Sequence, residues 1–177
     1  MSEPVILAAV DGSENALVAA GVAARFAQLL GGRMGLVTAL QVAGDSLAFG
    51  GGLLVGDLKN RLLEEARTAA EDNMRGVAER LQEQCRISMP EFFLREGSPE
   101  HEIPKLVQEN PDVAMVIVGK QGYGTESRPR GLPHFLGGLG GKLSAALPVP
   151  VLIVPPDIHP ELLCAQLIRP KPSQEKR

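Results

Sequence analysis

An acidic residue at the end of a predicted strand is the first residue here whose position suggests chemistry. Val5-Ile6-Leu7-Ala8-Ala9-Val10 is a continuous apolar run, and Asp11-Gly12-Ser13 follows it directly. A carboxylate in this position can accept a hydrogen bond from a ribose hydroxyl or hold a divalent cation beside phosphates. The alternative is structural, since either Asp11 or Ser13 could cap the helix that follows.

Two glycine-rich segments could bind an anion. Gly119-Lys120-Gln121-Gly122 follows a second apolar run, and Gly137-Gly138-Leu139-Gly140-Gly141-Lys142 precedes a short helical pattern. Glycine lets the backbone approach a ligand closely, and bare N–H groups at a helix start attract phosphate. Lys142 is not a P-loop lysine, because Leu136 and Leu143 replace the glycine and the hydroxyl residue of that motif. Each glycine alone also fits a tight turn, but their combination at one edge of a sheet favours a phosphate site.

The elements that must position these residues alternate between strand and helix. Strands are expected at residues 5–10, 34–40, 91–96, 113–118 and 149–154. Helices are expected up to Leu30, over 57–84, over 99–109 and up to about Leu147. This alternation implies right-handed crossovers and a parallel sheet covered on both faces. Ligands in such sheets bind beyond the carboxyl ends of the strands, so the loops after Val10, Leu40 and Val118 should form the site.

The helical patterns also predict which faces are buried. The first helix has an apolar face of Ala16, Ala20, Ala23, Ala27 and Leu30. The long helix over 57–84 has one of Leu58, Leu62, Ala66, Ala69, Val77 and Leu81. The glycine-rich stretch 41–56 is interpreted as a loop, either a flap over the site or a poorly ordered connection.

Composition excludes several classes of function. The chain has 20 glycines but only 3% aromatic residues, so stacking platforms for single-stranded nucleic acid lack their rings. The formal net charge of -3 provides no basic field for nucleic acid or anionic membrane. Cys85 and Cys164 form neither a CxxC pair nor a zinc spacing, which indicates a reduced, cytoplasmic chain. Neither an apolar run of about 18 residues nor a basic leader is found, so neither a membrane span nor a signal peptide is expected.

The order of these landmarks resembles the universal stress protein family, single-domain type. Val5 to Glu14 resembles the family's opening strand and Asp-Gly-Ser turn. Three later segments of the chain resemble the family's later landmarks in order: Arg95-Glu96-Gly97-Ser98-Pro99, Val116-Ile117-Val118-Gly119 and Val149-Pro150-Val151-Leu152-Ile153-Val154. The resemblance implies the adenine nucleotide alpha hydrolase-like fold, an α/β fold with a five-stranded parallel sheet in the order 3-2-1-4-5. It divides the chain into a domain over 1–156 and a C-terminal extension over 157–177, which is either partly disordered or docked through its leucines.

The resemblance further implies a nucleotide site for ATP or AMP at the carboxyl edge of the sheet. Asp11 matches the family's acid near the ribose and phosphates, where it could also hold magnesium with the nucleotide. Ala39 and Val118 fall on the positions that flank adenine, and Ala9 stands where nucleotide-binding members often have proline. The phosphate-binding segments of the family correspond to Gly119, Gly122, Gly137, Gly138 and Leu139.

The chain departs from the family's glycine pattern at two points. Fourteen residues separate Gly122 from Gly137, where the family pattern has nine, and Gly138 occupies the Ser/Thr position. One lost neutral hydrogen bond weakens binding by about tenfold at most. The longer loop adds Arg128 and Arg130 near Lys120, and these three are either further phosphate contacts or solvated surface residues.

These observations lead to ranked hypotheses of function. The first is a cytoplasmic regulatory protein that binds ATP or AMP, hydrolyses it weakly or not at all, and forms a homodimer through Val149–Val154. The alternative is a dimerisation or interaction module that has lost its nucleotide. A hydrolase ranks last, because Asp11 alone would have to supply both the base and the metal site. The histidines, which have no metal spacing and join no Ser-His-Asp set, are His101, His134 and His159.

Overall fold

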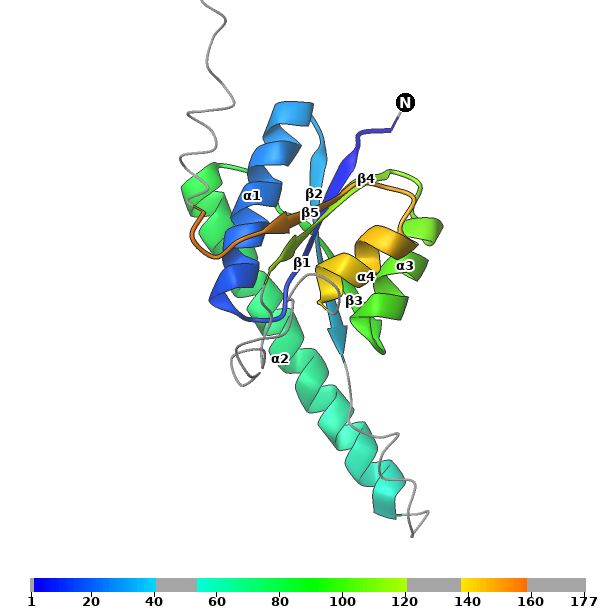
Figure 1. The fold of residues 1–177 in the computed structure, drawn as a ribbon. Coiled ribbons are helices and arrows are strands. Elements are labelled where there is room, and N and C mark those ends of the chain that lie inside the picture. Colours follow the sequence, from blue (N-terminus) through cyan, green and yellow to red (C-terminus); the bar gives the residue numbers. More distant parts are fainter. Residues whose placement is uncertain (1, 41–53, 121–137, 159–177) are drawn as a thin grey trace, which may run out of the picture.

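A computed structural model describes residues 2–40, 54–120 and 138–158, which form a five-stranded parallel sheet covered by helices (Figure 1). The strands lie in the order β3-β2-β1-β4-β5, as predicted. Their bounds are β1 Val5–Ala9, β2 Arg33–Leu40, β3 Glu91–Glu96, β4 Val113–Gly119 and β5 Val151–Val154. The helices are α1 Glu14–Leu30, α2 Leu54–Cys85, α3 Pro99–Glu109 and α4 Leu139–Ala146.

Strand β1 lies at the centre of the sheet because its residues are apolar on both faces. It pairs in parallel with β2, starting at Val5 opposite Arg33, and with β4, starting at Val5 opposite Val113. Ile6 and Ala8 belong to the core under α1 and α2, whereas Leu7 belongs to the core under α3 and α4. The sheet therefore has two aliphatic cores, one on each face. Because alternate side chains of β1 point into opposite cores, the strand is apolar at every position.

Helix α1 begins and ends at the residues that the sequence indicates. Ser13 is its N-cap, and the Ser13 hydroxyl accepts a 3.1 Å hydrogen bond from the Ala16 N–H. Gly31 follows the helix with a left-handed φ of 62° and returns its N–H to carbonyls of the last turn. The predicted alanine face is buried, but Leu30 is 53% exposed, so the inclusion of Leu30 in that face was wrong. Leu30 lies in the last turn, beyond the part of the helix that packs on the sheet.

Helix α2 differs most from its predicted packing. Val77 and Leu81 are buried as expected, but Leu62 is 46% exposed and Ala69 is exposed too. The helix has 32 residues, which span about 48 Å, whereas the eight residues of β2 span about 26 Å. Its N-terminal half consequently extends past the carboxyl edge of the sheet (Figure 1), where no strand covers it.

The other predicted boundaries agree closely, with one exception. Strand β5 covers Val151–Val154 and not 149–154, because Pro148 and Pro150 have no N–H to give to the ladder. The Pro150 carbonyl still accepts a hydrogen bond from the Val116 N–H. Most of the predicted loop 41–56 lies outside the described residues, and its last three residues belong to α2. No helix of the described chain is long and apolar enough to cross a membrane.

Two glycines provide a matched test of this packing. A Cβ at Gly35 of β2 would lie 2.9 Å from Phe93 Cε2 and 3.0 Å from Leu7 Cδ1, whereas a Cβ at Gly76 of α2 meets nothing within 4 Å. Gly35→Ala should therefore lower the free energy of unfolding by about 1–3 kcal/mol. Gly76→Ala should raise it by about 0.5–1 kcal/mol, because alanine favours the helix. Urea unfolding measures both, and equal effects of the two variants would contradict the packing described.

Candidate functional site

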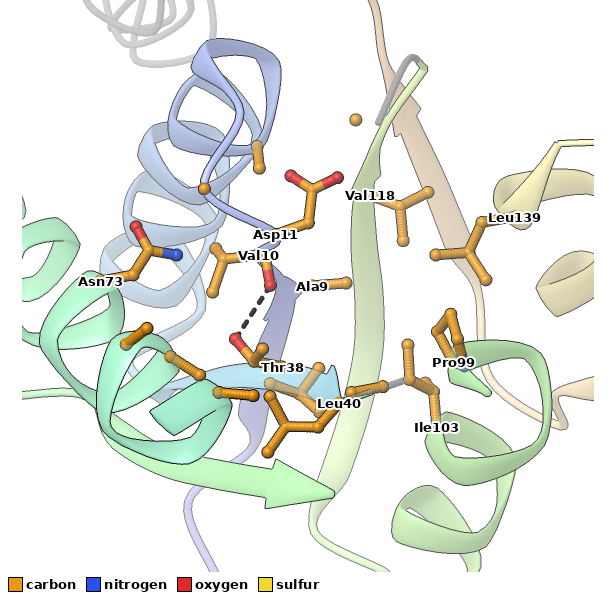
Figure 2. A pocket seen from close by; sticks show the side chains of 18 of the residues that line it. Ala9, Val10, Asp11, Thr38, Leu40, Asn73, Pro99, Ile103, Val118 and Leu139 are labelled. Atoms are coloured by element: carbon orange, nitrogen blue, oxygen red, sulfur yellow. Dashed lines mark hydrogen bonds between the residues drawn. The ribbon is translucent and has the colours of Figure 1, made fainter. Parts of the chain in front are cut away.

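The carboxyl ends of β1, β2 and β4 open on one cavity of about 530 Å³ (Figure 2). The strand order reverses between β1 and β4, since β1 leads to β2 and β3 on one side and β4 leads to β5 on the other. This reversal separates the loops and leaves a crevice at the sheet edge, which is where ligands of such folds bind. The cavity therefore lies at the strand ends where the sequence predicts a site, and its volume suits a small ligand; most of the loops after Leu40 and Val118 lie outside the described residues.

All of the predicted site residues that the structure describes line this cavity. They come from the ends of three strands and from the start of α4, and are Ala9, Asp11, Ala39, Val118, Gly119, Lys120, Gly138 and Leu139. Four further predicted residues lie outside the described part of the chain, namely Gly122, Gly137, Arg128 and Arg130.

In the Asp11-Gly12-Ser13 turn, Ser13 and not Asp11 is the N-cap of α1, a choice that the sequence left open. Ser13 caps α1, and Asp11 in turn accepts hydrogen bonds at Oδ1 from the Ser13 N–H (3.0 Å) and hydroxyl (2.7 Å). Gly12 between them has a φ of 84°, which a residue with a Cβ rarely adopts. The turn thus holds Asp11 exposed at the rim of the cavity, with the carboxylate oriented by Ser13.

A buried threonine fixes the end of β1 against β2. The Thr38 hydroxyl donates a 2.9 Å hydrogen bond to the Val10 carbonyl, drawn in Figure 2, and the Val10 N–H donates to the Val37 carbonyl at 2.9 Å. These bonds extend the pairing of the two strands beyond Ala9 and so set where the turn begins. Sequence reasoning missed Thr38, although a single polar residue within an apolar strand was the available signal.

Gly119 owes its identity to a close approach between β4 and α1. A Cβ at this position would lie 2.8 Å from Asn15 Nδ2 and 3.1 Å from Asn15 Cγ. Asn15 belongs to the first turn of α1 and is 8% exposed, so it has little room to move. Glycine here lets the end of β4 pass beside the start of α1, and both then border the cavity.

The start of α4 presents the Gly138 backbone and the apolar side chain of Leu139 to the cavity. Gly138 is the N-cap, with φ -79° and ψ 161°, and it has no side chain to accept from the first helical N–H groups. Lys142 in the same helix points elsewhere, because its Nζ forms a 3.0 Å ion pair with Glu100 of α3. The cavity therefore meets a helix N-terminus whose partial positive charge favours an anion.

Helix α2 forms a wall that the sequence reasoning did not predict. Ala66, Ala69, Ala70 and Asn73 recur at i, i+3, i+4 and i+7 and line the cavity together. The first two were predicted to face the core; instead they face the cavity, because this part of α2 runs past the sheet edge. Pro99 and Ile103 of α3 close the opposite side.

The chemistry of the cavity is that of a binding site. Its walls are mostly aliphatic, and the described polar side chains on them are Asp11, Thr38, Asn73 and Lys120. Among the described residues, no group of three or more His, Cys, Asp or Glu side chains could hold a metal ion. An apolar space with a few polar groups that fix orientation is typical of a small-molecule site.

The fold and the cavity define an α/β protein with a candidate ligand site at the carboxyl edge of its sheet. Comparison with known proteins gives the same class of protein. The sequence model of the universal stress protein family matches residues 4–155. The chain therefore belongs to the universal stress protein family, and its sheet has the adenine nucleotide alpha hydrolase-like topology of that family. A search of curated protein sequences gives no match.

Solved structures of low sequence identity share the fold. The universal stress protein UspA from Lactobacillus plantarum is 20% identical with a TM-score of 0.67, over 87% of this chain and 99% of that one. A universal stress protein in complex with cAMP is 18% identical with a TM-score of 0.60, over 87% and 98%. The universal stress protein from Archaeoglobus fulgidus in complex with dAMP is 16% identical with a TM-score of 0.56, over 85% and 96%.

Proposed function

We propose that this protein binds an adenine nucleotide, ATP or AMP, in the cavity at the carboxyl edge of the sheet. The observation that carries the proposal is the cavity of about 530 Å³ lined by Asp11, by Ala39 and Val118, and by the start of α4. Two relatives of the same fold were crystallised with cAMP and with dAMP, which supports a nucleotide as the class of ligand.

Each part of a nucleotide has a matching part of the cavity. The base lies between Ala39 and Val118, where aliphatic side chains replace stacking rings. The phosphates lie toward Gly119, Lys120 and the N-terminus of α4, where backbone N–H groups and a cation favour negative charge. Asp11 faces the ribose, and its carboxylate could instead share a magnesium ion with the phosphates, since Mg²⁺ is commonly held by one carboxylate plus substrate oxygens.

The role proposed is regulatory, with little or no hydrolysis. Efficient hydrolysis needs a base positioned on a water molecule. Among the described residues that line the cavity, Asp11 is the sole carboxylate and none is a histidine. A bound nucleotide would then act as a signal that stabilises one state of the protein and not as a substrate.

A second candidate function is an interaction module without a nucleotide. It is favoured by Gly138, which has no hydroxyl for a phosphate, and by the fourteen residues between Gly122 and Gly137. The two candidates differ in one measurable property, which is the response of the purified protein to nucleotide.

Titration calorimetry with ATP and magnesium tests the proposal directly. The protein should release or absorb heat at millimolar ATP or below, and its melting temperature should rise, because a ligand that binds only the native state stabilises it. Asp11→Ala should weaken this binding by about tenfold or more, because a hydrogen bond to a charged group is lost. Asp72→Ala, on the exposed side of α2, is the control and should leave binding unchanged.

Two outcomes would contradict this proposal. If neither ATP nor AMP at millimolar concentration changes the heat or the melting temperature, the interaction module becomes the better account. If phosphate release greatly exceeds that of a control with magnesium alone, the protein is a hydrolase and not a regulator.

Restoring a hydroxyl at Gly138 should strengthen nucleotide binding. The backbone of Gly138 is extended, with φ -79°, a conformation that serine adopts without backbone strain and in which its hydroxyl can cap α4. Gly138→Ser should raise the affinity for ATP by about threefold to tenfold, the value of one added hydrogen bond. Gly138→Ala adds the Cβ without the hydroxyl and should give no such gain. An equal effect of serine and alanine would mean that the hydroxyl does not reach the phosphates.

We also propose that the protein is a cytoplasmic homodimer that pairs through β5 and the preceding residues, over 149–154. Strand β5 is an edge of the sheet, and Ile153 on it is 39% exposed. An apolar edge strand favours pairing with a second copy. Light scattering should give twice the mass of 18.8 kDa, and Ile153→Asp should shift the protein toward the monomer, whereas Ile153→Val should not. A monomeric wild type would contradict the proposal.

A further inference from the structure

Asn73 has a position that the proposed nucleotide contacts leave unexplained. It is the polar member of the wall that α2 gives to the cavity, beside Ala66, Ala69 and Ala70. Figure 2 shows its amide nitrogen turned toward Val10 and the cavity. Within the described residues its side chain forms no hydrogen bond, and it is only half-buried. With respect to these residues, the amide can bind a ligand without first breaking a hydrogen bond to the protein.

The neighbour of this amide is the turn that carries Asp11. A Cβ at Gly12 would lie 3.5 Å from Asn73 Nδ2, so the amide packs against the backbone immediately after Asp11. Val118 and Leu139 lie on the other side of Asp11 in the same view (Figure 2). Val118 flanks the proposed site of the base, and Leu139 begins the helix toward which the phosphates are placed. The ribose joins these two parts of a nucleotide, so its diol is the part that can face Asp11 and Asn73.

We propose that Asn73, together with Asp11, binds the ribose diol and makes the site selective for ribonucleotides. A carboxylate is only an acceptor, whereas a carboxamide both donates and accepts. The two groups side by side can satisfy both hydroxyls of a vicinal diol. A site built to pair with a hydroxyl disfavours the analogue that lacks it, because its own polar group is then left without a partner. This inference rests on the proposed function, since it names the sugar that the same site selects.

The test measures the affinities for ATP, 2′-deoxyATP and 3′-deoxyATP, each with magnesium. The wild type should bind ATP about threefold to tenfold more tightly than at least one of the two deoxy analogues, which is the value of one hydrogen bond. In Asn73→Ala the ratio for the analogue that lacks the hydroxyl bound by Asn73 should fall to about 1, whereas any discrimination at the hydroxyl bound by Asp11 should remain. Asn60→Ala is the matched control, because Asn60 is exposed on the same helix and does not line the cavity; it should keep the wild-type ratio.

The melting temperature of each variant without ligand separates recognition from a structural role. If Asn73 merely supported the Gly12 turn, its loss would lower the melting temperature and leave the ratio of ATP to deoxyATP affinity unchanged, and the inference would be wrong. Equal weakening of all three nucleotides by Asn73→Ala would also overturn it, because Asn73 would then contact a group that all three share.

Failure of the inference and failure of the proposed function give different results. If the wild type binds none of the three nucleotides, the proposed function fails and the inference fails with it. If the wild type binds ATP but does not distinguish it from either deoxy analogue, the nucleotide site stands and only the role of Asn73 is overturned.

Discussion

The burial of β1 on both faces is the constraint on which the rest of the structure depends. Val5 to Ala8 are at most 3% exposed and contribute to both cores. A strand in this environment must pair on both edges. A buried N–H or C=O group without a hydrogen bond destabilises the fold by more free energy than one such bond contributes. The strand can end only where its last N–H and C=O groups form hydrogen bonds outside the regular ladder. Val10 forms such bonds with Val37 and Thr38, so the turn with Asp11 begins at the edge of the sheet and nowhere else.

The glycines near the cavity are explained chiefly by sterics. Gly12 takes a left-handed conformation, and Gly119 lets β4 pass Asn15 of α1. Gly140 of α4 serves the same purpose, because a Cβ there would lie 2.7 Å from Ile153 of β5. Close packing of this kind brings the backbone of β4 and α4 up to the cavity. Within the described residues, it is therefore this close packing that places main-chain groups of Gly119 and of the start of α4 beside the cavity.

The length of helix α2 helps to determine the shape of the cavity. A helix longer than the strands it covers must extend past one edge of the sheet, and here it extends past the edge that holds the cavity. Small side chains on that part of the helix leave space, and Asn73 adds a polar group where the helix meets the β1 turn. The same helix packs on the core through Met74, Val77 and Leu81. Core packing and the cavity wall are thus parts of one rigid element, which holds Asn73 in place.

The sequence by itself determined the type and order of the elements, and with them the edge of the sheet where Asp11, Ala39 and Val118 would meet. These are local properties: apolar runs, helical periodicity, a serine cap and a glycine stop each act over a few residues. Only the tertiary structure decided which helix surfaces are buried. Leu30 and Leu62 fit an apolar face yet are exposed, because the sheet does not reach them. Only the tertiary structure brought Thr38 to Val10 and Asn73 to Gly12, because contacts between residues so far apart in the chain depend on how whole elements pack.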